Sequence, residues 1–526
     1  MRTYSVRIAR QGKRKEKNMI GTVISGGVHG MEAFIVRVEC DISDGFPGFD
    51  FVGMLSSEVK EARERTITAL GNLNISVPPK KVTVNMAPAD VRKHGTGYDL
   101  PIAISILTAM GVIRQESVAN TLFIGELMLS GELNKVRGVL PVVKLAKEKG
   151  ISVCVVPEGN AREASVIEGM RVISVNDIRR LIDILNGESK PAYQTVHGLD
   201  IDDGKNGKSR TDNNFSRVSG QKVAKRGLEI AAAGMHNVLM VGPPGTGKTM
   251  LAKCLPGILP PMTTEEAIEV SSVYSVAGML TEENPLITER PVIEAHHTST
   301  EISLCGGGNI PKPGLVTLAH RGVLFLDEMP EFSRKVLEVL RQPLEDKVIN
   351  VARNGYDVRY PAQFMLVGAM NPCPCGMYPD MNKCTCTETM RKKYSSKLSK
   401  PLLDRIDLCL QVLRPGSEEL MSKTEEENSE TVRTRVMAAH EIQKERYKGK
   451  AYFNSQMGVE EIEKYCALNT EERKLMERAI SKYELSARAY HRVLRTARTI
   501  ADLDGSEVLN VRHISEALFY KSNGDF

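Results

Sequence analysis

The sequence predicts an α/β protein of several domains, in which a parallel sheet carries a phosphate-binding loop and a helical region follows. Three observations predict this fold class. An apolar run at 238–241 enters a glycine-rich loop and a helical pattern, an apolar run at 323–326 ends in two acidic residues, and helical patterns fill residues 432–526. The length of 526 residues is enough for about three to four domains.

The composition is typical of a soluble globular protein, with 41% apolar and 26% charged residues. Tryptophan is absent and aromatic residues make up 5%, so few surfaces can stack on bases or sugars. The chain has no run of eighteen or more apolar residues, which excludes a membrane-spanning helix.

The positive charge of the chain is concentrated in a basic leader at residues 1–18. The formal net charge is +5, and the leader holds seven basic residues and one acidic residue, which leaves a net charge of −1 for the rest. The leader has no apolar segment of the secretory type. It is either a transit peptide or, more simply, the result of an upstream start, with Met19 opening the folded protein.

Polar stretches divide the rest of the chain. Residues 19–185 mix β-rich runs with amphipathic patterns and are predicted to form an N-terminal α/β domain. Its predicted strands and helices are 34–38, 81–86, 151–156, 58–73 and 100–110. Residues 186–214 are predicted to be a polar linker, with an ordered surface loop as the alternative. A core domain at 215–415 and a helical domain at 430–522 follow.

The strongest motif is G-x-x-x-x-G-K-T between a strand and a helix, which is typical of a loop that binds a nucleoside triphosphate. Its glycines let backbone N–H groups converge on phosphate oxygens. Lys248 is predicted to neutralise the β- and γ-phosphates, and the Thr249 hydroxyl to bind Mg²⁺. The loop consists of Gly242, Pro243, Pro244, Gly245, Thr246, Gly247, Lys248 and Thr249.

The partner motif is the acidic pair Asp327–Glu328 after the apolar run at 323–326. In an open parallel sheet, ligands bind at the carboxyl ends of the strands, where these side chains emerge. Asp327 is predicted to hold Mg²⁺, and Glu328 to act as the general base on the attacking water. ATP and Mg²⁺ are therefore the expected substrate and cofactor.

Together with further motifs, these residues resemble the magnesium-chelatase-like branch of the AAA+ ATPases, and within it the YifB/ComM group. The resemblance extends over residues 20–520 and implies a ring-forming, hexameric ATPase with a C-terminal helical lid. The further motifs are Ala295–Thr298, Gly306–Gly308, Pro311–Gly314, Ala369–Gly376, Pro401–Leu408, Gly45–Gly53, Val84–Asp90 and Gly97–Ala103.

The resemblance also implies roles for individual residues. Asn371 matches sensor 1, which orients water beside the γ-phosphate, and Gln221 matches a segment near the adenine. His296 and His297 match a histidine pair of the group, for which a positioning role is expected because phosphoryl transfer does not need them as catalysts.

Arg405 matches the arginine finger, which stabilises charge on the nucleotide of a neighbouring subunit. The alternative is a local salt bridge to Asp404 or Asp407. Arg488 matches the sensor-2 arginine of the lid, with Arg492 and Arg495 as competing candidates.

A basic hairpin is predicted at 348–360, because Asn354-Gly355 lies between two β-rich runs. In AAA+ ATPases of this branch such a hairpin precedes sensor 1 and enters the pore of the ring. Arg353 and Arg359, with Lys347 at the base, are candidates for contacts to a DNA backbone. The alternative is a solvated hairpin without a ligand.

Four cysteines form a C-x-C…C-x-C pattern after sensor 1 that is compatible with a structural Zn²⁺ site. A disulfide is the weaker alternative, since ten cysteines in a chain of this length indicate a reducing, cytoplasmic setting. The four are Cys373, Cys375, Cys384 and Cys386.

The N-terminal domain resembles the proteolytic domain of Lon, which has the S5 domain 2-like fold, at 123–127 and 131–140. Lon cleaves peptides with a serine–lysine dyad, and the corresponding stretches at 95–100 and 138–141 contain neither residue. The domain is therefore expected to bind or assemble rather than to cleave.

Two functions remain open. The first is an ATP-driven ring that translocates or remodels DNA, as a helicase or in branch migration during recombination or transformation, which the YifB/ComM resemblance implies. The second is a motor that remodels a protein partner, like the ATPase subunit of magnesium chelatase. A DNA-translocating ring predicts salt-sensitive DNA binding.

Overall fold

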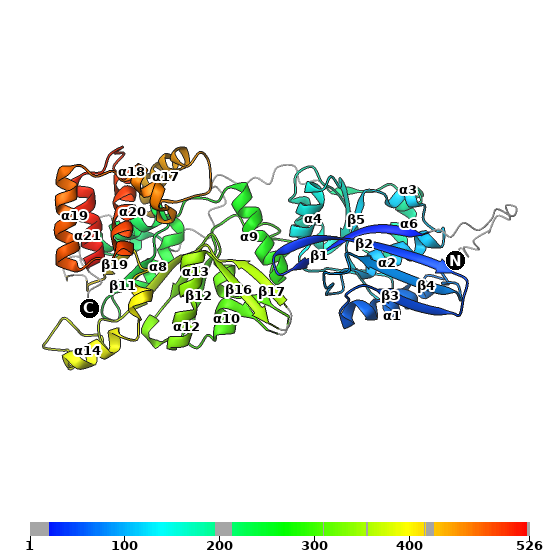
Figure 1. Ribbon diagram of the computed structural model, residues 1–526, viewed down its shortest axis with the longest axis horizontal. Helices are drawn as coiled ribbons and strands as arrows, with labels where there is room; N and C mark the ends of the chain where they lie inside the picture. Colours follow the sequence, from blue (N-terminus) through cyan, green and yellow to red (C-terminus); the bar gives the residue numbers. More distant parts are fainter. Residues whose placement is uncertain are drawn as a thin grey trace. The chain divides into compact units, whose positions relative to one another are not determined.

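The computed structural model describes residues 20–194, 213–308, 310–353, 356–414, 416 and 426–522, with residues 353 and 356 described in their backbone alone (Figure 1). The described chain forms two compact units. The first contains residues 20–194 and the short segment 278–285, and the second contains the remainder. The basic leader predicted at 1–18 lies outside the described residues.

The first unit is built on an eight-stranded mixed sheet with the strand order β10-β9-β8-β5-β1-β2-β4-β3. Alternating buried and exposed positions in β4 place Val82, Val84 and Met86 in the core. The strands are β1 (Gly21–His29), β2 (Glu32–Ser43), β3 (Gly48–Val52), β4 (Lys81–Ala87), β5 (Thr121–Phe123), β8 (Val153–Pro157), β9 (Arg171–Val175) and β10 (Tyr193–Gln194), with β6 (Glu126–Leu127) and β7 (Leu133–Asn134) forming a separate pair.

Helix α2 (Asp99–Ala109) is the central helix of this unit and is buried along its whole length, because its sequence is apolar on all sides. At its first turn the buried carboxylate of Asp99 accepts hydrogen bonds of 2.7 and 2.9 Å from Arg65 of α1 (Ser57–Asn72), which joins the two helices. The other helices are α3 (Gln115–Val118), α4 (Val139–Glu148), α5 (Ala161–Ser165) and α6 (Ile178–Leu185).

The first unit continues beyond the point where the sequence predicts a linker. Strand β10 pairs antiparallel with β9, so the chain stays in the first sheet until at least Gln194. Residues 195–212 of the predicted linker lie outside the described residues.

The second unit contains the predicted parallel sheet, whose five strands have the order β12-β15-β18-β11-β19 and are parallel at every pairing. Every residue of β11, β15 and β18 is buried, as expected where helices cover both faces of a sheet. The strands are β12 (Val292–Ala295), β15 (Val323–Leu326), β18 (Met365–Met370), β11 (Val238–Val241) and β19 (Leu408–Gln411).

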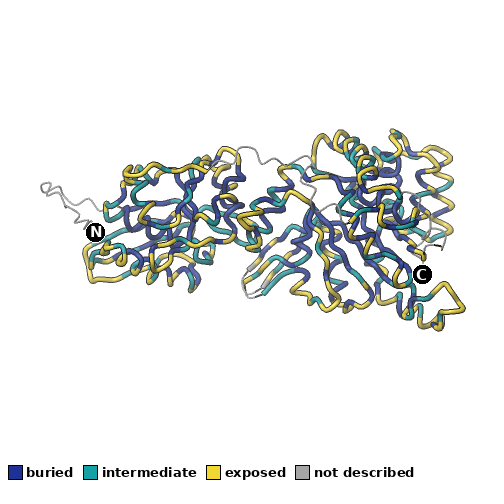
Figure 2. Tube along the Cα trace, turned by 180° about the vertical axis from the view of Figure 1, so that it is seen from behind, coloured by how far each residue is buried: buried dark blue, intermediate teal, exposed yellow. Residues whose placement is uncertain are grey.

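The C-terminal helices share one hydrophobic core with this sheet. Leu410 of β19, Ile500 and Leu518 belong to the same buried cluster, and the Tyr520 hydroxyl donates a 3.1 Å hydrogen bond to the Val223 carbonyl of α7 (Lys222–Gly234). These helices are α17 (Ser429–Arg446), α18 (Val459–Tyr465), α19 (Thr470–Tyr483), α20 (Ala487–Leu503) and α21 (Val511–Ser522). In Figure 2 the buried residues follow the strands of each unit, and exposed residues lie along the outer helices.

The remaining helices of the second unit connect the strands of its sheet. They are α8 (Lys248–Cys254), α9 (Thr264–Ala277), α10 (Glu301–Cys305), α11 (Leu315–Leu318), α12 (Arg334–Val339), α13 (Arg341–Asp346), α14 (Glu388–Ser395) and α15 (Lys400–Leu403). None of the helices in the described ranges is both long enough and apolar enough to cross a bilayer.

Two hairpins extend from the second unit. The predicted one is formed by β16 (Val348–Arg353) and β17 (Tyr356–Pro361), with Arg353 paired to Tyr356, whereas residues 354 and 355 lie outside the described residues. The other consists of β13 (Gly306–Gly307) and β14 (Lys312–Pro313). The hydroxyl of Tyr360 donates a 2.8 Å hydrogen bond to the Pro311 carbonyl, so the two hairpins pack side by side.

Candidate functional site

The phosphate-binding loop connects the end of β11 to the start of α8. Gly245 and Gly247 have φ angles of +74° and +92°, a backbone region that side chains with a Cβ rarely adopt. Gly242 is also tightly enclosed, since a Cβ there would lie 2.0 Å from the Val412 carbonyl oxygen. The glycines of the motif are therefore required by the conformation of the loop.

Lys248 points back across its own loop. Its ammonium group donates hydrogen bonds of 2.7 and 2.9 Å to the carbonyls of Gly242 and Pro243, and one of 3.2 Å to Oδ1 of Asn371. Burial lowers the pKa of Lys248, which Asp327 and Glu328 oppose. The predicted sensor-1 residue therefore lies directly beside the predicted phosphate-binding lysine.

Thr249 and the acidic pair complete this cluster. The Thr249 hydroxyl donates a 2.7 Å hydrogen bond to Oδ2 of Asp327, which follows the last residue of β15. Glu328 is exposed and has a φ of +48°, and its carboxylate takes no part in the Thr249–Asp327 hydrogen bond. The structure thus brings together Lys248, Thr249, Asp327 and Asn371 at the carboxyl edge of the sheet.

The histidine pair lies at the same edge. His296 and His297 follow the end of β12. In the parallel pairing of β12 with β15, Ala295 lies opposite Leu326, which directly precedes the acidic pair. Both rings are exposed and their centroids are 4.1 Å apart. Nδ1 of His296 lies 2.8 Å from the Thr298 hydroxyl.

Gln221 is the residue before α7 and has a φ of +58°. Its side-chain amide donates a hydrogen bond to the Leu413 carbonyl, just beyond the end of β19. Gln221 is therefore attached to the strand next to β11.

Arg405 and Arg488 lie at the opposite, amino edge of the sheet. Arg405 precedes β19 and is buried, and its guanidinium binds Glu345 and donates a 2.6 Å hydrogen bond to the Pro401 carbonyl. Arg488, in the first turn of α20, donates a 2.9 Å hydrogen bond to the same carboxylate. Both arginines therefore share Glu345, rather than the Asp404 or Asp407 considered as partners of Arg405.

These arginines line a cavity of about 420 Å³, which we call the basic cavity. Asn237, at the amino end of β11, is part of its wall and donates a 2.9 Å hydrogen bond to the Arg405 carbonyl. The phosphate loop begins at Gly242, beyond the other end of the same strand and five residues from Asn237, which is about 17 Å at about 3.3 Å per residue. The basic side chains of the cavity are Lys347, Arg405, Arg488, Arg492 and Arg495.

The side chain of Lys347, which was predicted to contact DNA at the base of the hairpin, lies in the basic cavity instead. It ends α13 with a φ of +59°, which turns the chain toward β16 and directs the side chain into the basic cavity. Its ammonium donates a 2.8 Å hydrogen bond to the Leu344 carbonyl, and burial lowers its pKa to about 8. Arg359 is exposed on β17 opposite Asn350, whereas the side chain of Arg353 lies outside the described residues.

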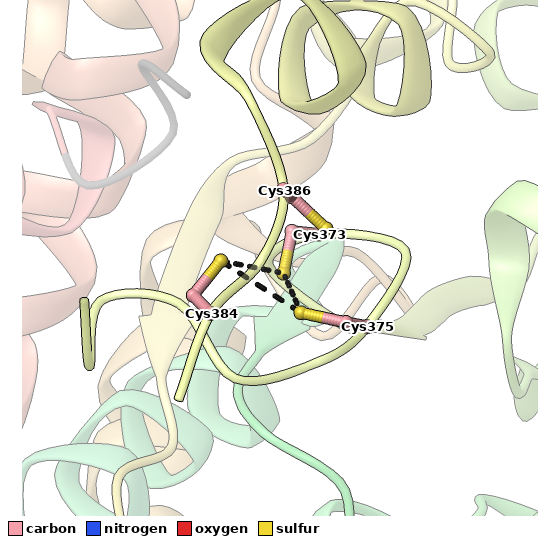
Figure 3. Close-up of side chains that lie close together, drawn as sticks. All are labelled: Cys373, Cys375, Cys384 and Cys386. Carbon is pink, nitrogen blue, oxygen red and sulfur yellow. Dashed lines mark hydrogen bonds between the residues drawn. The ribbon is translucent and has the colours of Figure 1, made fainter. Parts of the chain in front are cut away.

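The four predicted cysteines come together in one cluster (Figure 3). The sulfur of Cys373 lies 3.4 Å from that of Cys375 and 3.8 Å from that of Cys384, and the sulfurs of Cys375 and Cys384 are 3.7 Å apart. A tetrahedral site with Zn–S bonds of about 2.3 Å has edges of about 3.8 Å. Disulfides require about 2.05 Å, and all ten cysteines are free.

The loop that carries this thiol cluster contacts the phosphate loop. Gly376 has a φ of +75°, and a Cβ there would lie 2.6 Å from Cδ of Pro244. A backbone hydrogen bond from Met377, followed by the neighbouring thiols, lowers the pKa of Cys375 to about 6, which favours the thiolate that a metal ion binds. The cluster thus follows the predicted sensor-1 residue Asn371 in the chain, and its loop packs against Pro244.

Glu345 was not predicted as a site residue. It belongs to no motif, and its only signal in the sequence is its place three residues before the predicted hairpin. The two arginines that donate hydrogen bonds to its carboxylate, Arg405 and Arg488, lie 60 and 143 residues further along the chain.

Three family models match the chain. Residues 214–420 match magnesium chelatase, subunit ChlI. Residues 38–160 match subunit ChlI of Mg-chelatase, and residues 426–521 match the C-terminal region of magnesium chelatase subunit ChlI.

Similarity to individual proteins extends over nearly the full chain. The competence protein ComM of Haemophilus influenzae is 42% identical over 506 residues, which cover 96% of this chain and 97% of the relative. YifB of Escherichia coli is 39% identical over 94% of this chain and 95% of its own length. The magnesium-chelatase 38 kDa subunit of Cereibacter sphaeroides is 30% identical over 30% of this chain and 52% of its own length.

Proposed function

Because this chain belongs to the YifB/ComM group of magnesium-chelatase-like AAA+ ATPases, we propose that it is a ring-forming ATPase that uses ATP hydrolysis to remodel or translocate DNA. The observation that carries the ATPase proposal is the cluster of Lys248, Thr249, Asp327 and Asn371 at one edge of the sheet. These four side chains follow three different strands and lie together at the carboxyl edge of the sheet, where proteins of this fold class bind the β- and γ-phosphates of a nucleotide.

Each side chain of this cluster has a task in hydrolysis. Lys248 would neutralise charge on the β- and γ-phosphates, and Thr249 with Asp327 would hold Mg²⁺, which would offset the charge that develops on the phosphates. Glu328 takes a proton from the attacking water, because its exposed carboxylate is free of the Thr249–Asp327 pair. Asn371 orients that water beside the γ-phosphate. Gln221 is assigned to the adenine end of the nucleotide.

Arg405 and Arg488 serve the nucleotide of a neighbouring copy. They lie at the amino edge of the sheet, a strand length from their own phosphate loop, so they reach a γ-phosphate that another subunit presents. A guanidinium supplied in trans makes hydrolysis depend on assembly. We propose a hexamer, the ring size that the family resemblance implies.

DNA is the substrate that the hairpin favours. Arg359 is exposed on β17, and the adjacent β13–β14 hairpin presents the exposed Lys312, so two packed hairpins offer positive charge to a phosphate backbone. A competence protein among the relatives agrees with branch migration during recombination. The second candidate is a motor for a protein partner, supported by the similarity to a magnesium-chelatase subunit.

We also propose that the thiol cluster binds structural Zn²⁺. Four soft sulfur donors at tetrahedral spacing fit this ion, which would fix the loop after sensor 1 against the phosphate loop. Free thiols throughout the chain favour a cytoplasmic location.

The first unit is proposed to be a Lon-like binding or assembly module without peptidase activity. The stretches 95–100 and 138–141, which correspond to those of the Lon dyad, contain neither its serine nor its lysine.

The decisive experiment measures ATP hydrolysis with and without forked or single-stranded DNA, together with DNA binding at low and high salt. Arg359→Ala is compared with Arg512→Ala, which removes an exposed arginine from α21. We expect DNA to stimulate the wild type, and Arg359→Ala to reduce binding and lower the salt dependence by about one phosphate contact. ATP hydrolysis without DNA binding at low salt would favour the protein-remodelling motor instead.

A further inference from the structure

The basic cavity has more positive charge than its own acids can neutralise. Five cationic side chains line it, whereas its acidic residues are Glu345, Asp404 and Asp407. Within the described part of the chain, Nε of Arg405, Nη1 of Arg492 and Nε of Arg495 are buried without a hydrogen-bond partner. Buried donors are nearly always satisfied in native structures, so these three N–H groups are suited to an anion with several acceptor oxygens.

Asp407 is held too firmly to be exchanged for such an anion. Its carboxylate is buried and accepts a 2.9 Å hydrogen bond from the backbone N–H of Asn237. Although burial alone would raise its pKa, His236 and Arg492 hold the pKa of Asp407 well below its usual range. Asp407 therefore belongs to the permanent wall of the cavity.

Glu345 is placed differently, at the opening of the cavity. One of its oxygens binds Arg405 and the other lies 2.9 Å from Arg488, so it spans both guanidinium groups as two oxygens of a phosphate would. Its side chain is 46% exposed, and the residue lies in the last turn of the short helix α13. Exposure makes the exchange of this carboxylate for another anion inexpensive.

We propose that Glu345 occupies, in the isolated chain, the place of the terminal phosphate of a neighbouring copy's ATP, and that this phosphate displaces it on assembly. The inference rests on the proposed function, in which Arg405 and Arg488 act in trans. Glu345 keeps both guanidinium groups oriented before assembly, and it competes with the incoming nucleotide. It is a positioning residue, because it acts through the two arginines.

Glu345→Gln tests this competition, because glutamine keeps the size of the side chain and removes its charge. The matched control is Asp346→Asn, which removes a charge from the adjacent, exposed position of α13 outside the cavity. Assembly is titrated with ATPγS and Mg²⁺ and followed by sedimentation velocity. We expect Glu345→Gln to reach half-maximal assembly at a nucleotide concentration at least about fivefold below that of wild type and Asp346→Asn.

Glu345→Gln in the Arg405→Ala background should not lower the nucleotide concentration needed for assembly. One of the two guanidinium groups for which the carboxylate and the phosphate compete is then missing. Glu345→Ala should behave like Glu345→Gln, and the melting temperature of each variant checks that it is folded. An unchanged or raised nucleotide requirement in both folded variants would overturn the role of Glu345.

The failure of the inference can be told from that of the proposed function. If wild type hydrolyses ATP and Arg405→Ala does not, but Glu345→Gln assembles like wild type, the role of Glu345 alone is wrong. If wild type neither binds nor hydrolyses ATP, the proposed function is wrong.

Discussion

The hydroxyl of Thr249 donates a 2.7 Å hydrogen bond to the carboxylate of Asp327, 78 residues further along the chain. Thr249 lies in the first turn of α8, after the loop that follows β11, whereas Asp327 directly follows β15, and β18 separates these two strands in the sheet. Hydroxyl and carboxylate oxygens are ligands that Mg²⁺ prefers beside bound phosphates. Their direct contact supports the proposal that these two residues hold the ion.

Glu328→Gln should separate ATP binding from hydrolysis. Glu328 adjoins this pair but takes no part in the Thr249–Asp327 contact, so its loss leaves the proposed Mg²⁺ ligands intact. We expect nucleotide affinity close to that of wild type and turnover reduced by a factor of about 10²–10⁴. Fluorescent-nucleotide binding and phosphate release measure the two quantities. Glu331→Gln, which neutralises an exposed acid three residues later, should hydrolyse normally, and equal losses in both variants would contradict the role of Glu328.

Mixing two inactive variants tests whether Arg405 acts on a neighbour. Lys248→Ala disables the phosphate loop and Arg405→Ala disables the amino edge of the sheet, and each should be inactive alone. In a mixed ring, some interfaces pair an intact loop with an intact arginine, so turnover should return to a substantial fraction of wild type. The recovery is measured as the steady-state rate of ATP hydrolysis at several mixing ratios of the two variants. No recovery, although the two proteins form mixed rings, would mean that Arg405 acts within its own chain.

The parallel sheet and its carboxyl edge could be predicted because short-range patterns encode them. Val238–Val241 and Val323–Leu326 are continuous apolar runs, as expected for strands buried on both faces, and each is followed directly by its chemical group. The four thiols could be brought together in the same way, since all of them lie within one loop of 14 residues. Local sequence thus contains enough information for groups that follow adjacent strands or share a loop.

The basic cavity could not be predicted from such patterns. Lys347 was assigned to the hairpin because it precedes β16, but a left-handed backbone at that residue turns its side chain toward Arg492 and Arg495 of α20. The segment 278–285 is a second example, since it leaves the second unit and packs in the first, where Lys135 donates a 2.6 Å hydrogen bond to the Leu280 carbonyl. The position of the Lys347 side chain and the packing of segment 278–285 both depend on contacts between distant parts of the chain. The periodicity of a local sequence carries no information about such contacts.

Removal of the thiol cluster should affect both metal content and the nucleotide site. Wild type purified under reducing conditions should contain about one zinc ion per chain, and Cys384→Ser should contain much less. Because the cysteine loop packs on Pro244, we also expect a lower melting temperature and weaker ATP binding in Cys384→Ser. Elemental analysis, thermal unfolding and fluorescent-nucleotide titration measure these changes.

The control for this comparison is Cys154→Ala, which removes a buried thiol of β8 in the first unit. It should keep its zinc and its nucleotide affinity. Wild type without zinc, or Cys384→Ser with a full complement of it, would contradict the proposed metal site.

The difference in stability between wild type and Lys347→Met should depend on pH. Burial, reinforced by Arg492 and Arg495, lowers its pKa from 10.5 to about 8, so the folded protein holds this proton less tightly than the unfolded chain. The protonated lysine therefore destabilises the fold fully below pH 8, and this effect declines as the pH rises toward 10.5. Lys347→Met should raise the free energy of unfolding at pH 7 by about 1–3 kcal/mol, since a tenfold change in proton affinity is worth about 1.4 kcal/mol.

Urea unfolding of wild type and Lys347→Met at pH 7 and pH 10 measures this difference, with Lys474→Met as the control from an exposed position of α19. The stabilisation by Lys347→Met should shrink as the pH rises, because the wild-type lysine then loses its proton in the folded state. The control should show a small difference at both values. A stabilisation of equal size at both pH values would indicate that methionine packs better in the cavity, and that the charge of Lys347 is not what destabilises it.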